Sequence, residues 1–126
     1  MSAGSVLHAA LAAHLRATIR VFDAPPVRAA MPLAVLGEAV LAASDATGVS
    51  GRIGTIAVDY ADTGADPARL RALVGQVEAA MAGAPRALSE GWQLVGLRLT
   101  KSRMVRGKTD RWSATSEFAV RMYRVQ

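Results

Sequence analysis

Hydrophobic and polar residues alternate along the last third of the chain, from Trp92 to Gln126. From Trp112 onwards the apolar residues stand on one parity: Trp112, Ala114, Phe118, Val120 and Met122. A period of two is typical of a β-strand with one buried and one exposed face. The preceding segment carries Val95, Leu97 and Leu99 on one parity. The pattern predicts a long C-terminal β-hairpin. Since such strands are longer than the core of so small a domain, we expect the tip to project as an arm.

Two other segments have the apolar spacing of amphipathic helices. The first is predicted from Val6 to Ile19, with Ser2 or Ser5 as its N-cap. Its buried stripe should contain Leu7, Leu11, Leu15 and Ile19. The second has Asp66 as its predicted N-cap and Pro67 in the first helical position. Its buried stripe should contain Leu70, Leu73, Val74, Val77 and Met81.

Two apolar segments between these helices predict strands. The run from Leu33 to Leu41 favours a strand, although its alanines leave a helix possible. A further strand is predicted from Arg52 to Tyr60. The glycines of the segment 48–54 indicate a flexible loop. The order α-β-β-α-β-β then predicts one α+β domain, residues 1–126, in which two helices pack on one face of a largely antiparallel sheet.

The composition narrows the class of protein. The chain has 126 residues, of which 52% are hydrophobic, enough to bury one core. It has no cysteine, which excludes disulfides and thiolate metal sites. No apolar run reaches the roughly 20 residues of a membrane helix, and the N-terminus lacks the basic segment of a signal peptide. We therefore expect a soluble intracellular protein that does not bind a membrane.

No catalytic, cofactor or metal site can be recognised in the sequence. His8 and His14 would lie about 240° apart around a helix axis, so they cannot share a metal. The spacing of Asp59, Asp62 and Asp66 does not match a calcium loop, and Asp62 is interpreted as a turn residue. We expect no enzyme, although a small ligand-binding domain with a concave pocket stays open as an alternative.

The net charge of +5 is concentrated near the predicted hairpin tip, at Lys101, Arg103, Arg106, Lys108 and Arg111. Trp92 and Trp112 are expected nearby. Three interpretations stay open for this basic cluster. It could bind nucleic acid through its cations and aromatic rings, it could be a solvated hairpin end, or it could contact a neighbouring subunit. The five residues are the candidate subunit or tube interface.

Several motifs carry a resemblance to a known family. They are the segments RVFDAPP at 20–26, MPLAVLGE at 31–38, AGAP at 82–85 and LVGLRL at 94–99, followed by a basic turn and a final strand. Their order and spacing, over essentially the whole chain, resemble the small tail-completion (tail terminator) proteins of long-tailed phages and gene transfer agents.

The resemblance implies a structural role. Such proteins form a ring, typically of six subunits, that caps the tail tube, stops its polymerisation and joins it to the head-side connector (stopper) protein. DNA passes through the ring without specific binding, and no cofactor is involved. The resemblance places the protein in the tail or neck of a virion or gene transfer agent particle, assembled in the bacterial cytoplasm. The alternative is a nucleic-acid-binding module that uses the basic C-terminal hairpin.

Overall fold

Nine elements of secondary structure form in a computed structural model that describes the whole chain, residues 1–126. In chain order they are α1 (Ala3–Arg16), β1 (Val21–Phe22), β2 (Leu33–Leu36), β3 (Val40–Ala43), β4 (Val49–Thr63), α2 (Ala68–Ala82), the 3₁₀ turn η1 (Ser89–Gly91), β5 (Gln93–Arg106) and β6 (Arg111–Val125). The predicted α+β class and the long C-terminal hairpin are confirmed.

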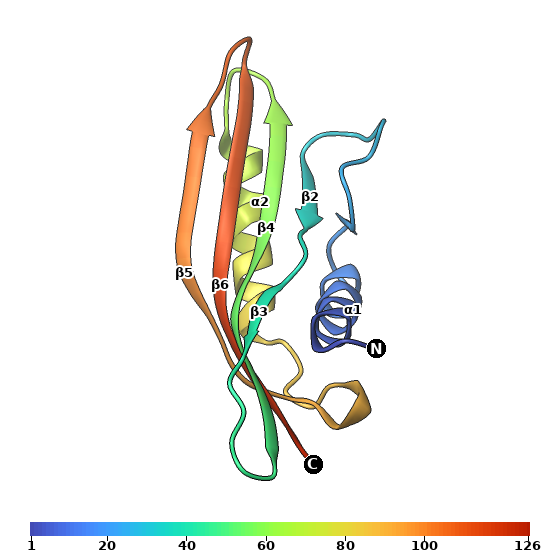
Figure 1. Ribbon diagram of the computed structural model, residues 1–126. Helices are drawn as coiled ribbons and strands as arrows, with labels where there is room; N and C mark the ends of the chain where they lie inside the picture. Colours follow the sequence, from blue (N-terminus) through green and yellow to red (C-terminus); the bar gives the residue numbers. More distant parts are fainter.

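The long strand β6 lies inside the sheet, between β4 and β5. The strand order is β1-β2-β4-β6-β5, and β3 pairs with β4 beyond the end of β2. Only β1 and β2 are parallel; the other pairs are antiparallel. Figure 1 shows that β4, β5 and β6 run side by side along an elongated molecule, with α2 behind them.

The hairpin is part of this sheet and is not a free arm, so the arm prediction is wrong. β6 pairs with β4 along its whole length, from Thr63 opposite Arg111 to Val49 opposite Val125. The Gly64 N–H also donates to the carbonyl of Asp110 at 2.8 Å. The reason is the length of β4, which is as long as the hairpin strands and satisfies the backbone groups of β6. The hairpin tip therefore lies at one end of the elongated sheet (Figure 1).

Side-chain alternation holds in β6 and fails in β5. In β6 the buried residues are Ala114, Ser116, Phe118, Val120 and Met122. In β5, Leu97 is buried as predicted, but Val95 is 54% exposed and Leu94 is buried instead. The register shifts between Leu94 and Gly96 and again between Leu99 and Lys101. Each bulge reverses the faces of the residues after it, which a period of two cannot anticipate.

Both helices pack on one face of the sheet, as predicted. Helix α1 begins at Ala3, three residues before the predicted start, because the Ser2 side chain already accepts the Ser5 N–H as an N-cap. In α2 the cap position is Pro67, and Asp66 still accepts the Ala68 N–H at 2.9 Å. Leu7, Leu11 and Leu15 of α1 and Leu70, Val77 and Met81 of α2 enter one common core. Neither helix is long and apolar enough to span a membrane.

Two predictions for residues 33–54 are wrong. The single strand expected from Leu33 to Leu41 is divided into β2 and β3, both antiparallel to β4. The expected flexible loop is partly strand, because Gly51 and Gly54 lie within β4. A Cβ atom on Gly54 would collide with the carbonyl oxygen of Val40, and one on Gly51 with that of Ser44. The glycines allow the backbone of residues 40–44 to approach β4 closely.

The side of β4, β6 and β5 that faces away from the helices is left uncovered, and we call it the open face. It is formed by the odd-numbered residues of β4 and β6, 53–63 and 111–121, and on β5 by Gly96, Arg98, Lys101, Arg103 and Val105. Figure 1 views the sheet from this side, with α2 behind the strands. The two sides of the molecule are thus chemically different: one is covered by helices and the other is bare sheet.

Candidate interaction surface at the hairpin end

Lys101 and Arg103 lie on the open face. Ser102 between them points to the other side, where its hydroxyl donates to Oε2 of Glu78 on α2 at 2.7 Å. Because neighbouring residues of a strand alternate, Lys101 and Arg103 point away from the helix. Both are exposed and neither forms an ion pair within the chain.

Arg106 lies on the opposite side of the hairpin. Its Nη2 donates to Oδ1 of Asp110 at 3.2 Å, and its guanidinium lies 5.5 Å from the centre of the Trp112 ring. The Trp112 indole N–H donates to the carbonyl of Gly64 at 3.0 Å. The ring of Trp112 is therefore covered on one side by a cation, and its only polar group is already bonded.

Lys108 and Arg111 complete the basic end of the hairpin. Lys108 lies in the tip, where Thr109 and Asp110 adopt left-handed backbone conformations with φ of 58° and 53°. Arg111 begins β6 opposite Thr63 and lies on the open face. The five predicted residues thus surround one end of the sheet on both sides and do not form one flat patch. Trp92, expected nearby, lies at the other end of the hairpin, where Arg124 and Arg52 stack on its ring.

The sequence prediction missed two further cations of the open face, Arg98 and Arg121. Alternation in β6 places Arg121 on the exposed parity, so this residue could have been found from the sequence. Arg98 could not, because its face depends on the bulge after Leu94. The pairing of β5 with β6 brings the two arginines onto the same side of the sheet.

A buried ion pair anchors α2 beside the hairpin tip. Asp62 is 1% exposed and accepts hydrogen bonds from Nε and Nη2 of Arg69, the shortest at 2.6 Å, and from the Thr63 N–H at 2.7 Å. Burial opposes the ionisation of Asp62, but these hydrogen bonds outweigh it, and its pKa lies below the ordinary 3.8. The prediction that Asp62 is a simple turn residue is wrong, because only the fold brings Arg69 to it.

We expect Arg69→Met to lower the free energy of unfolding at pH 7 and to lower it less as the pH falls below 3.8, for example at pH 3. A carboxylate with a depressed pKa stabilises the fold above its unfolded pKa, and this contribution is lost as the pH falls through the folded pKa. Urea unfolding at both pH values measures the difference. Arg71→Met is the matched control, since Arg71 is exposed on the same helix and forms no ion pair. An equal loss at both pH values would contradict the role of Asp62.

The only chain of polar side chains that reaches the core joins α2 to the sheet. The Tyr60 hydroxyl lies 2.9 Å from Oγ of Ser116, which donates to Oε2 of Glu78 at 2.6 Å. Burial raises the pKa of Tyr60 above its usual range, so the hydroxyl stays neutral. Glu78 also borders an open hollow of about 400 Å³ between α2 and the hairpin. These groups bond one another, which is typical of a structural network.

His8 and His14 are both half-buried at the surface of α1. Nε2 of His8 lies 3.3 Å from the carbonyl of Leu36, and Nε2 of His14 lies 2.7 Å from that of Ala80. Each histidine thus connects α1 to a different neighbouring segment. No group of three or more His, Asp or Glu side chains gathers that could hold a metal ion.

Comparison with known proteins gives a family match and matches to solved structures. A family model described as "Tail completion protein gp17" matches residues 6–123. Among solved structures, a chain in the virion of a native gene transfer agent (GTA) particle aligns with a TM-score of 0.83 and 27% identity, over 98% of this chain and 99% of that chain. No curated protein matches this sequence.

Proposed function

The chain belongs to the family of tail completion protein gp17, and from this premise we propose that its subunits form a ring that caps the finished tail tube. The ring, typically of six subunits, stops further polymerisation of the tube protein. It then joins the tube to the head-side connector, or stopper, protein. In this proposal residues 1–126 act as one tail-terminator-like domain in the tail or neck of a phage or gene transfer agent particle, assembled in the bacterial cytoplasm.

The single observation that carries the proposal is the match along the whole chain to a component of a GTA particle. The almost complete coverage of both chains and the TM-score of 0.83 mean that the two proteins share one fold and are similar in length. The shape of the subunit is compatible with a ring. Neighbours in a cyclic ring join unlike surfaces, and here one side of the sheet is covered by helices while the other is bare.

We infer that the basic hairpin end is one of the contact surfaces of the ring, either with the next subunit or with the tube. Lys101, Arg103, Arg106, Lys108 and Arg111 lie in the second half of β5, in the turn and at the start of β6, and this turn is one end of an elongated subunit (Figure 1). This end of the subunit can contact a component above or below the ring, while the sides of the subunit contact its neighbours in the ring. Charged residues there favour specific orientation and rapid association more than affinity.

DNA passes through the ring in this proposal without specific binding, and the protein is not an enzyme. The alternative, a nucleic-acid-binding module at the hairpin, needs an aromatic ring on which bases can stack. Trp112 is poorly suited to this role, because Arg106 covers its ring and Gly64 engages its N–H. The cations alone would give only salt-dependent attraction to phosphates.

The proposal is tested by producing particles in cells that lack this chain. We expect tail tubes of uncontrolled length that are not joined to heads, because nothing ends polymerisation. Electron microscopy measures tail length and attachment, and native mass spectrometry of the purified chain reports the size of the ring. A plasmid copy of the gene is the control and should restore uniform, attached tails. Normal particles in the absence of the chain would refute the proposal.

A further inference from the structure

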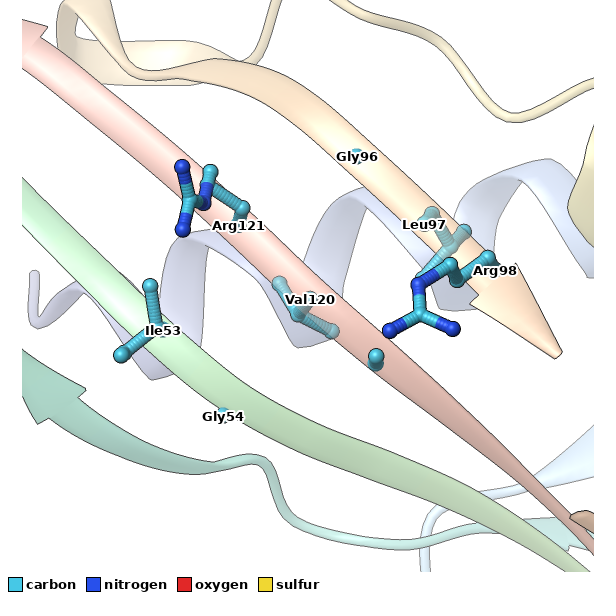
Figure 2. A pocket seen from close by; sticks show the side chains of 8 residues that line it. Ile53, Gly54, Gly96, Leu97, Arg98, Val120 and Arg121 are labelled. Carbon is cyan, nitrogen blue, oxygen red and sulfur yellow. The ribbon is translucent and has the colours of Figure 1, made fainter. Parts of the chain in front are cut away.

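A shallow trough crosses the open face next to Lys101, on the side away from the hairpin tip. It has a volume of about 500 Å³, and its floor includes Ile53 of β4, Ala119 of β6 and the backbone of Gly96 of β5. Arg98 and Arg121 border it. Figure 2 shows Arg121 on the side of Ile53 and Arg98 on the side of Leu97, with a helix behind the sheet. The trough therefore combines an apolar floor with two cations.

The two arginines have no partner within the chain. Neither side chain forms an ion pair or a hydrogen bond, in contrast to Arg16, Arg52 and Arg69. Lys101 and Arg103 continue the line of cations along β5 on the same face. Two unpaired guanidinium groups that line one trough attract anions. The charge of the trough is thus complementary to an acidic ligand.

A second copy of this chain is a poor source of such anions. Apart from Glu38 and Glu117, every Asp and Glu side chain already accepts a hydrogen bond or forms an ion pair within its own chain. Glu117 lies on the open face itself, so it would approach the trough only if two like faces met. Glu38 of a second copy is exposed and free, but one carboxylate cannot neutralise both arginines, so a different, acidic molecule is the better source of the ligand.

The floor of the trough favours a protein over a nucleic acid. Ile53 is 39% exposed and lines the trough, so an apolar group of a ligand could cover it there. Phosphate groups gain nothing from an apolar floor, whereas a peptide can place an aliphatic side chain there. Guanidinium groups at the borders can pair with carboxylates through two parallel hydrogen bonds.

We propose that this trough binds an acidic protein segment, with carboxylates on Arg98 and Arg121 and an apolar side chain on Ile53 and Ala119. In a tail particle the segment would belong to a neighbouring tail component. The inference does not depend on ring formation, because it concerns a surface of the isolated subunit. Its failure would leave the tube-capping proposal untouched.

Gly96 offers a way to block the trough without disturbing the fold. A Cβ atom at this position meets only the Cβ of Arg121, at 3.9 Å, which is ordinary contact. The backbone of Gly96 does not adopt a left-handed conformation that would require glycine. A larger side chain is therefore compatible with strand β5 and would fill the space above the floor.

The test uses the purified full chain and a short fluorescein-labelled peptide in which glutamate and leucine alternate. We expect binding, measured by fluorescence anisotropy, to weaken at least about tenfold in Arg98→Glu/Arg121→Glu, about 1.4 kcal/mol. Gly96→Phe should weaken it similarly, with Gly96→Val as a smaller variant should the phenylalanine prevent folding. The matched control is Arg28→Glu/Arg86→Glu, which has the same net charge and alters exposed arginines outside the trough. Circular dichroism confirms that each variant is folded.

Four results would overturn the proposal. The peptide could fail to bind the unaltered chain, or the control variant could weaken binding as much as the trough variants. A peptide of alternating glutamate and serine could bind equally well, which would remove the role of the apolar floor. Finally, a short duplex DNA could bind more tightly than the peptide and depend on the same two arginines, which would identify the surface as a nucleic-acid contact.

Discussion

Replacing Arg103, Arg106 and Lys108 together by glutamate is expected to prevent the assembly of complete particles while leaving the chain folded. All three side chains are exposed, so their loss removes no core packing. Each reversal changes the charge by two units, so the net charge falls from +5 to −1. Charges that attracted the next component would then repel it. Replacing the central contact residues of an interface typically weakens binding by at least about 2 kcal/mol, or about 30-fold in affinity.

The measurement is the titre of functional particles when the variant gene replaces the natural one. We expect a fall of at least about 30-fold, since ring closure repeats the weakened contact. The triple variant Arg28→Glu/Arg71→Glu/Arg86→Glu has the same net charge and should retain the titre. Equal losses in both variants would mean that net charge alone matters. An unchanged titre of the hairpin variant, with a normal circular dichroism spectrum, would exclude the hairpin end as a contact surface.

Phe118→Ala is expected to cause the largest loss of stability in the hairpin. Phe118 is 2% exposed on β6, which has a neighbour on each side, and truncating such a side chain typically costs about 3–5 kcal/mol. A domain of this size has a total stability of about 5–15 kcal/mol, so the variant would be close to unfolding. Urea unfolding of Phe118→Leu, with an expected cost below about 1.5 kcal/mol, gives a measurable value should the alanine variant not fold.

Leu99→Ala is the matched control for this prediction. Leu99 lies directly opposite Phe118 in the register of β5 and β6, but it is 42% exposed on the edge of the sheet. Its truncation should cost less than about 1 kcal/mol, since most of the removed surface already contacts water. A loss for Leu99→Ala well above about 1 kcal/mol would show that the edge of β5 is covered by another element.

Local sequence patterns predicted the elements whose structure is decided by residues close together in the chain. The stripe of Leu7, Leu11 and Leu15 indicated α1, and the alternation from Trp112 to Met122 indicated β6 with the correct buried face. The start of α1 was missed by three residues, while Ser2, one of the two predicted N-caps, is the cap. In each case the residues that decide the structure are neighbours in the chain, so their spacing is sufficient to recognise it.

Structural features that depend on contacts between residues distant in the sequence were missed or interpreted wrongly. Gly51 and Gly54 indicated a loop, but they are glycines because residues 40–44 approach β4 there. Asp62 was interpreted as a turn residue, yet its charge is buried against Arg69. The bulges of β5 reverse the expected faces, because register depends on hydrogen bonding to β6. None of these contacts leaves a periodic signal in the sequence.

The two helices, the hairpin, the α+β class and the cluster of cations near residues 101–111 could be recognised from the sequence. Composition and spacing along the chain are sufficient to recognise each of them. Only the tertiary structure decided that the hairpin is bound along β4 and is not an arm, and which cations share a face. It alone brought Arg98, Arg121 and Ile53 around one trough. The physical reason is that strand pairing joins residues far apart in the chain, and the side that each side chain faces follows from that register.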